Sequence, residues 1–199
     1  MWNTATGTCS HVVQGHSGTV RAACWSPDGR ILATCSTDRT ARLWDVNSAE
    51  CLHILHAHTH AVTSIEFSPD GSNLATGSAD SSVKVWSSHT GTLLQSLKGH
   101  NGLILSIAWD PSGGSIATAA GDHTARLWDA TTGTLKHVLG EHSNWVWSVK
   151  WSPDGHMLAT AEGSCTVKLW DVDTRTLLHV LEGPSDFLSQ WSGVPMAAH

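Results

Sequence analysis

One nine-residue stretch recurs along this chain at a fixed interval, and the repeat strongly limits the folds open to it. The stretch is TDRTARLWD, residues 37–45, and its Trp44 is matched by Trp86, Trp128 and Trp170. Each step between these tryptophans is 42 residues (86−44, 128−86 and 170−128). A period of about 40 to 45 residues is typical of proteins in which one repeat is one four-stranded unit. The chain is therefore predicted to be built from copies of a single small unit.

The repeat divides the sequence into four complete units and two partial ones. The complete units are residues 15–56, 57–98, 99–140 and 141–182. A partial unit, residues 1–14, precedes them, and a degenerate unit with a tail, residues 183–199, follows them. Because the repeat counts units directly, it describes the organisation better than the length of 199 residues does.

Within each unit, short apolar runs alternate with turn residues. In the first unit the runs are Val20–Trp25, Ile31–Ser36, the segment ending at Trp44, and Cys51–Leu55, with Ser-Pro-Asp-Gly at 26–29. Proline restricts φ and glycine supplies positive φ in such turns, so they join neighbouring strands. Short runs with turn residues between them predict an all-β fold.

Four residue types also keep constant positions within the units. The complete sets are His16, Thr34, Asp38 and Trp44; His58, Thr76, Asp80 and Trp86; and His100, Thr118, Asp122 and Trp128. The fourth unit has His142, Thr160 and Trp170, but Ser164 stands in place of the aspartate. Polar groups at such positions can be buried when they satisfy one another, and a satisfied network holds one strand register.

These residues, with Gly-His at the start of a unit and Trp-Asp near its end, resemble the WD-repeat β-propeller family. The resemblance covers residues 1–183. It implies four-stranded antiparallel blades around a central channel, each repeat supplying the outer strand of one blade and the inner three of the next. It also implies a hydrogen-bonded tetrad, in which the aspartate holds the histidine, the histidine meets the threonine hydroxyl, and the hydroxyl meets the indole N–H.

The tetrad residues also resemble a nucleophilic triad, but we predict no enzyme activity. A site repeated in every unit is structural, and a hydroxyl bonded to a buried indole cannot attack a substrate. Because Ser164 replaces the aspartate, His142 is expected to be less well held. The fourth blade is therefore predicted to be the least protected of the complete blades in hydrogen exchange.

Two other patterns are candidate binding sites. Basic residues precede each repeat tryptophan by two positions: Arg42, Lys84, Arg126 and Lys168. Three of them precede an aspartate by three positions, so we expect compensated charges rather than an anion site. His56, His58 and His60 alternate along an extended segment and could face a metal. Because His58 belongs to a tetrad and no carboxylate or thiol is adjacent, we predict no metal or cofactor.

The fourth unit carries the candidate binding surface. Trp145 precedes its first strand, and Trp147 stands where the other units have Arg21, Thr63 and Leu105. In WD-repeat proteins this loop opens onto a face commonly used for partners, and large aromatic residues are frequent binding hot spots. Leu103 and Leu105 of the third unit could extend the surface. Packing between blades is the alternative role for the two tryptophans.

Composition argues against some classes of partner and some cellular compartments. The formal charge of −6 and the absence of a basic run argue against nucleic acid. Five cysteines, an odd number with no CxxC pair, indicate neither a disulfide framework nor a zinc site. No apolar run approaches the ~18 residues of a membrane span, and residues 1–11 lack the features of a signal peptide. We therefore expect an intracellular protein that does not bind a membrane. The cytoplasm is the expected compartment, and the nucleus is not excluded by these features.

The two ends of the sequence raise the question of how the ring is completed. They contain a predicted outer strand at Thr8–Val13 and a predicted inner strand around Phe187–Trp191. These strands are not neighbours within a blade, so they cannot close the ring by pairing. Three arrangements remain: a longer propeller with further repeats, association with another copy, or an open arc with exposed edges. We expect the first, because the sequence begins at the tryptophan of a motif.

The predicted function follows from the resemblance and from the lack of any catalytic or cofactor pattern. It is a non-catalytic scaffold that binds a protein or peptide within a multi-subunit assembly. The alternative is an accessory propeller domain of a larger signalling protein or enzyme whose catalytic part lies outside this sequence.

Overall fold

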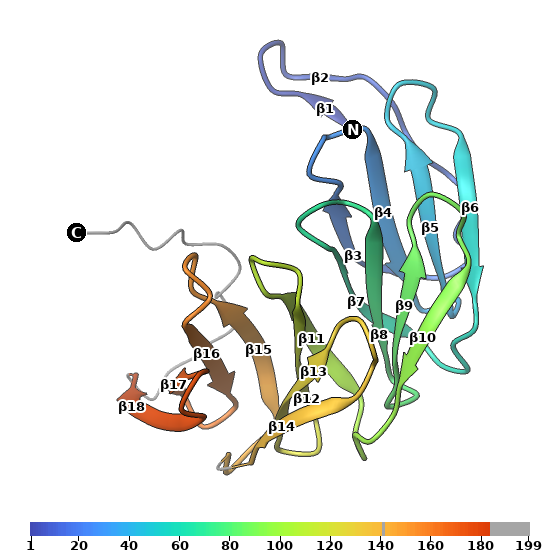
Figure 1. The fold of residues 1–199 in the computed structure, drawn as a ribbon. Coiled ribbons are helices and arrows are strands. Elements are labelled where there is room, and N and C mark those ends of the chain that lie inside the picture. Colours follow the sequence, from blue (N-terminus) through green and yellow to red (C-terminus); the bar gives the residue numbers. More distant parts are fainter. Residues whose placement is uncertain (141, 184–199) are drawn as a thin grey trace.

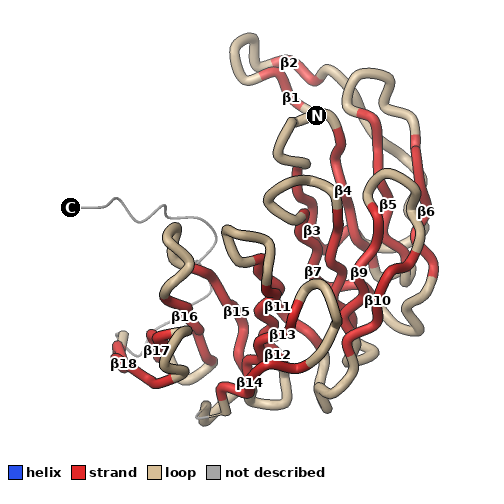
Figure 2. Tube along the Cα trace, viewed as in Figure 1, coloured by secondary structure: helices blue, strands red, loops and turns tan. Residues whose placement is uncertain are grey.

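The computed structural model describes residues 1–140 and 142–183. Over these residues the chain forms strands and turns without a helix (Figure 2). Four sheets of four antiparallel strands follow one another along the sequence and are arranged as an arc (Figure 1). The predicted fold class, an all-β propeller of four-stranded blades with an open ring, is confirmed.

Each sheet is one blade, numbered here in chain order. Blade 1 contains β3 (Val20–Trp25), β4 (Ile31–Ser36), β5 (Thr40–Asp45) and β6 (Cys51–His56). Blade 2 contains β7 (Val62–Phe67), β8 (Asn73–Ser78), β9 (Val83–Ser87) and β10 (Leu93–Leu97). Blade 3 contains β11 (Ile104–Trp109), β12 (Ser115–Ala120), β13 (Ala125–Asp129) and β14 (Leu135–Leu139). Blade 4 contains β15 (Val146–Trp151), β16 (Met157–Glu162), β17 (Thr166–Asp171) and β18 (Thr176–Glu182).

The Ser-Pro-Asp-Gly turns join the first and second strands of blades 1, 2 and 4. In blade 1 the N–H of Gly29 donates to the carbonyl of Ser26 over 2.8 Å, and Gly29 has a φ of 70°. The carboxylate of Asp28 accepts the Ser26 hydroxyl at 2.6 Å. Glycine reaches this left-handed φ without steric cost, which explains its place in the turn. The first strands line the concave side of the arc, and the fourth strands lie on the outside (Figure 1).

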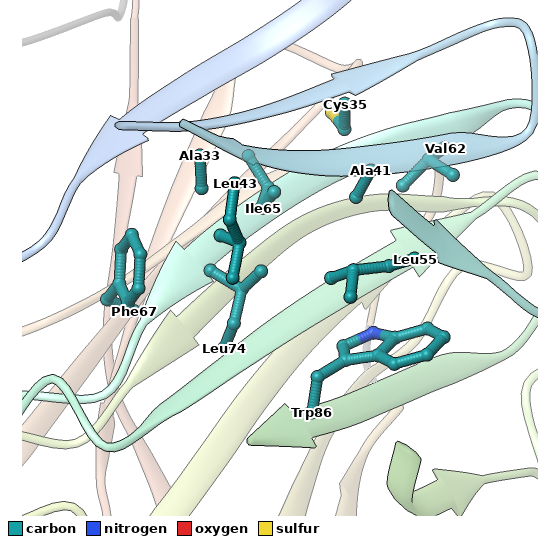
Figure 3. Packing of buried hydrophobic residues seen from close by; sticks show 10 residues of the cluster. All are labelled: Ala33, Cys35, Ala41, Leu43, Leu55, Val62, Ile65, Phe67, Leu74 and Trp86. Atoms are coloured by element: carbon teal, nitrogen blue, oxygen red, sulfur yellow. The ribbon is translucent and has the colours of Figure 1, made fainter. Parts of the chain in front are cut away.

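The hydrophobic core lies between successive blades rather than inside any one of them. Between blades 1 and 2 it consists of Ala33, Cys35, Ala41, Leu43 and Leu55 on one side and Val62, Ile65, Phe67, Leu74 and Trp86 on the other (Figure 3). Equivalent positions meet between blades 2 and 3 and between blades 3 and 4. Each blade therefore has a forward face, which packs on the following blade, and a rear face, which packs on the preceding one.

The arc ends without closing. No strand of blade 1 pairs with a strand of blade 4 in the described part of the chain. The partial unit at the start forms only a hairpin, in which β1 (Trp2–Asn3) pairs with β2 (Thr8–Cys9). The outer strand predicted at Thr8–Val13 is thus wrong beyond Cys9, because its partner β1 is only two residues long. The inner strand predicted around Phe187–Trp191 lies outside the described residues.

Candidate functional site: the tetrads and the tryptophan surface

Each of the first three blades has a hydrogen-bonded tetrad that links four segments. In blade 2, His58 Nδ1 lies 2.9 Å from Asp80 Oδ2, and His58 Nε2 lies 2.9 Å from Thr76 Oγ1. The indole N–H of Trp86 donates to Thr76 Oγ1 over 2.8 Å. The corresponding distances in blade 1 are all 2.8 Å, and those in blade 3 are 2.8, 2.7 and 2.9 Å. The tetrad thereby ties the segment before each first strand to the second and third strands.

The contacts of the network fit one arrangement of its protons. Trp86 can only donate, so Thr76 Oγ1 accepts from it and can give its own proton to His58 Nε2. The remaining proton of the neutral imidazole then lies on Nδ1 and is donated to the carboxylate of Asp80. Both the hydroxyl and the imidazole are fully used by these contacts.

The aspartate is the centre of each complete tetrad. Asp80 also accepts the N–H of Thr59 at 2.9 Å, and the N–H and hydroxyl of Ser82 at 3.0 and 2.6 Å. Burial raises the pKa of Asp80, but the hydrogen bonds from Ser82, Thr59 and His58 outweigh it and hold the pKa well below its usual range. The same contacts hold Ser81 at a positive φ of 66° in the turn between β8 and β9.

A pair of tryptophans lies where the chain enters blade 4. The rings of Trp145 and Trp147 are 5.6 Å apart between centroids, with an angle of 45° between their planes. Their exposed fractions are 38% and 53%. Two glycines lie beside them: a Cβ on Gly121 would be in ordinary contact with Trp145 at 3.5 Å, whereas one on Gly163 would lie closer than usual, 3.1 Å from the Trp147 indole nitrogen.

The two leucines of the candidate surface lie in blade 3. Leu103 and Trp145 both flank Gly121, so the structure brings them together. Leu105 is half-buried and occupies the β-bulge of β11, the position that Trp147 occupies in β15. We call Leu103, Leu105, Trp145 and Trp147 the tryptophan surface.

The predicted alternative for the two tryptophans, packing between blades, has some structural basis. Trp145 of blade 4 lies against the Gly121 turn of blade 3. In blade 2 the bulge position is Thr63, whose hydroxyl donates to the carbonyl of Ile104 in the following blade. Trp147 therefore stands at the edge of blade 4 where a following blade would begin.

Comparison with known families agrees with the geometry. The profile of the family described as "WD domain, G-beta repeat" matches residues 7–45, 49–87, 91–129 and 133–171, well over half of the chain. The chain belongs to the WD-repeat family. WD repeats generally mediate contacts between proteins and are typically non-catalytic. A search of curated proteins finds no match.

The fourth WD repeat departs from the tetrad. His142 Nε2 lies 2.8 Å from Thr160 Oγ1, and Trp170 donates to the same oxygen over 2.9 Å. His142 Nδ1, however, is buried and has no hydrogen-bond partner among residues 1–140 and 142–183. Burial and the nearby Lys168 lower the pKa of His142 to about 4, although carboxylate and carbonyl oxygens near the ring oppose this shift.

Glu162 takes over part of the missing aspartate's role, which sequence reasoning did not foresee. Its carboxylate accepts the N–H of Ser143 over 2.8 Å, a bond made to the aspartate in the other WD repeats. Its Oε1 also lies 3.5 Å from Lys168 Nζ. The sequence does contain a signal for this role, because Glu162 is acidic and the other units have Ser36, Ser78 and Ala120 at its position.

We expect the double substitution Glu162→Ser/Ser164→Asp to raise the free energy of unfolding by about 1–2 kcal/mol, because it satisfies a buried polar group. The variant copies blade 1, and the new aspartate would stand four residues before Lys168, as Asp122 stands before Arg126. Amide exchange in β15–β18 should become slower, whereas in the unchanged protein it should be faster than in blades 1–3.

The single substitution Ser164→Asp is the matched control. It should stabilise less, because the new carboxylate would lie close to that of Glu162. If the double variant had the same melting temperature and the same amide exchange in β15–β18 as the unchanged protein, the tetrad would not stabilise blade 4 as predicted.

Arg126 and Lys168 are paired with carboxylates, as expected, but not with the aspartate three positions further along the chain: Lys168 Nζ lies 3.5 Å from Glu162. Arg126 Nη2 lies 3.7 Å from Asp122, not beside Asp129, which instead lies 3.1 Å from Lys136. Asp45 Oδ1 likewise accepts the N–H of Ser48 in its turn over 2.8 Å. Successive side chains of a strand point to opposite faces, so residues three apart cannot meet.

The histidine cluster considered as a metal site is divided by the fold. His58 lies in its tetrad, whereas His56 and His60 are exposed. Residues 1–140 and 142–183 contain no group of three His, Cys, Asp or Glu side chains placed to hold a metal ion. They also contain no helix long and apolar enough to cross a membrane.

Proposed function

We propose that this WD-repeat chain is a non-catalytic scaffold that binds a protein or peptide within a multi-subunit assembly, through the tryptophan surface. The observation that carries the proposal is the exposed indole pair. The repeat tryptophans, such as Trp128, are buried to about the same degree in every blade, whereas Trp145 and Trp147 present their rings to solvent. Exposed aromatic side chains backed by rigid turns are typical of binding hot spots, because they lose little entropy on binding.

The contacts of the tetrads support a non-catalytic role. The Thr118 hydroxyl accepts from Trp128 and lies 2.7 Å from His100 Nε2, while His100 Nδ1 lies 2.8 Å from Asp122. A nucleophile needs a free hydroxyl and a base that can take its proton, and here both groups serve strand packing.

Charge and cysteine chemistry support the class of partner and the compartment. The net charge of −6 disfavours nucleic acid, so we propose a protein or peptide with an apolar contact segment. All five cysteines are free, and two of them are exposed. Free exposed thiols suit a reducing compartment, and we place the role in the cytoplasm or the nucleus.

A second candidate is an accessory domain of a larger signalling protein or enzyme. The observation that favours it is the uncovered blade face at each end of the arc, where Val20 and Leu181 are exposed. Catalytic or nucleotide-binding motifs in the reading frame beside this sequence would support that role.

The test is the double substitution Trp145→Ala/Trp147→Ala, compared with the unchanged protein by affinity capture and mass spectrometry. We expect the captured partner to be lost, with a melting temperature close to that of the unchanged protein, because both indoles lie at the surface and neither belongs to a buried core cluster. Leu94→Ala, at a leucine 52% exposed in blade 2, is the matched control and should retain the partner. Retained capture by the double variant, or a large fall in its melting temperature, would contradict the proposal.

A further inference from the structure

The rear face of blade 1 is uncovered at positions that are buried in blades 2 and 3. Val20 is 50% exposed, whereas its equivalents Val62, Ile104 and Val146 are each 0% exposed. Trp25 is 52% exposed, whereas Phe67 and Trp109 are 6% and 7% exposed. A hollow of about 480 Å³ opens beside Val20 and Trp44 on this face.

The forward face of blade 4 is uncovered in the same way. Leu181 is 52% exposed, whereas its equivalents Leu55, Leu97 and Leu139 are each 2% exposed. Val167 and Leu169 are half-buried, and the residues at their positions in the other blades are buried. The two ends of the arc therefore carry the two halves of one kind of interface.

Hydrogen bonds at the interfaces between blades show which acceptors a forward face supplies and which donors a rear face supplies. Ser64 and Ser106 on forward faces accept the N–H of Ile107 and Val149 at 3.2 and 3.4 Å. The indoles of Trp109 and Trp151 donate to the carbonyls of Glu66 and Ala108 in the preceding blade at 3.2 and 3.0 Å.

Both halves of this pattern are present at the open ends. Blade 4 offers the hydroxyl of Ser148 at the position of Ser106, and the carbonyl of Lys150 at the position of Ala108. Blade 1 offers the N–H of Ala23 and the indole N–H of Trp25 at the positions of the donors. The Trp25 indole makes no hydrogen bond to any described residue, so its donor is open to a second chain.

We propose that the forward face of blade 4 binds the rear face of blade 1 of a second copy of this chain, in the register of the internal blade interfaces. Leu181 packs against the second copy's blade 1, Trp25 donates to the carbonyl of Lys150, and Val20 is buried at the joint. The joint is head-to-tail, so two copies can form two joints and close a ring. Such a ring holds eight blades, four from each copy, within the usual range of about four to eight.

The experiment is sedimentation velocity of the full chain over a range of concentrations, with one substitution on each face. The unchanged protein should reach the mass of two copies, twice 21.2 kDa. Leu181→Asp and Trp25→Asp should each raise the dissociation constant at least about thirtyfold, as expected for an anchor at the centre of an interface. An equimolar mixture of the two variants should associate again, because each retains the face that the other has lost.

The mixture distinguishes this joint from misfolding and from head-to-head association. Misfolded variants would not recover on mixing, and a head-to-head dimer would survive one of the two substitutions. Leu94→Asp, at an equally exposed leucine on β10, is the matched control and should associate like the unchanged protein. A monomer at every concentration, or no recovery in the mixture, would overturn the proposal. Leu181→Asp leaves Trp145 and Trp147 unchanged. Because Trp147 stands at the edge of blade 4 that the joint would cover, the monomeric variant should capture a partner at least as well as the unchanged protein.

Discussion

Replacing Asp80 with alanine is expected to lower the free energy of unfolding by about 2–3 kcal/mol, because it leaves buried hydrogen-bond donors without their acceptor. The carboxylate accepts four hydrogen bonds, from His58, the Thr59 N–H, and the N–H and hydroxyl of Ser82. Its loss leaves the Nδ1–H of a buried imidazole without an acceptor and releases Ser81 from its left-handed conformation. Both effects weaken the joint between β7, β8 and β9.

The measurement is urea unfolding followed by tryptophan fluorescence, because the repeat indoles lie beside the tetrads. Asp70→Ala is the matched control: this aspartate also accepts hydrogen bonds, from Ser68 and Ser72, but in an exposed turn. Its replacement should cost about 1 kcal/mol or less. If Asp80→Ala and Asp70→Ala lowered the free energy of unfolding equally, the tetrad would not stabilise the fold more than an exposed turn does.

Acid should begin to destabilise the protein below about pH 6.5, before most of its carboxylates titrate. The pKa of His142 is lowered to about 4 from its ordinary value of 6.5, because burial and Lys168 disfavour the charged ring. Below pH 6.5 His142 becomes protonated in the unfolded chain, whereas in the folded chain it stays neutral down to about pH 4. Stability is therefore full above pH 6.5 and falls as the pH drops to 4, by about 3 kcal/mol from this residue.

Other tetrad groups also make the protein less stable as the pH falls, each over its own pH range. Burial lowers the pKa of His58 and His100 despite their aspartate partners, so each also loses stability below pH 6.5. The pKa of Asp38 and that of Asp80 lie below the usual value, because hydrogen bonds outweigh the effect of burial. Their contribution is present above the unfolded pKa of about 3.9 and is lost as the pH falls further.

Urea midpoints at several pH values between about 7.5 and 4 check this prediction. His142→Gln cannot titrate, so its stability should depend less on pH than that of the unchanged protein. His60→Gln, at an exposed histidine, is the matched control. Equal pH dependence in the unchanged protein and in His142→Gln would show that the ring is not buried in its neutral form.

Much of the architecture could be predicted because its signals are local and are repeated four times. The first strands, for example Val20–Trp25 and Ile104–Trp109, begin and end where the apolar runs predicted. The glycine of each Ser-Pro-Asp-Gly turn has the positive φ that the motif requires. A residue pattern that recurs four times leaves little room for a competing register.

Differences between the copies were less predictable, because they depend on which side chains meet across strands and blades. Gly77 is an example: its equivalents are Cys35, Ala119 and Ala161, and a Cβ here would lie 2.5 Å from a methyl carbon of Ile104. The glycine compensates for a larger residue in the following blade. Nothing in the sequence around residue 77 shows this, because the two residues meet only across the interface between blades 2 and 3.

By itself, the sequence determined the period, the number of blades, their strand order and the tetrad positions, because these follow from local patterns that recur every 42 residues. The tertiary structure alone decided that Glu162 replaces part of a lost aspartate, that Arg126 pairs with Asp122, and that Trp147 stands at the edge of the arc. It also showed that Val20 and Leu181 are exposed at opposite ends. Burial at a blade face depends on a neighbouring blade, and no local pattern records whether that neighbour is there.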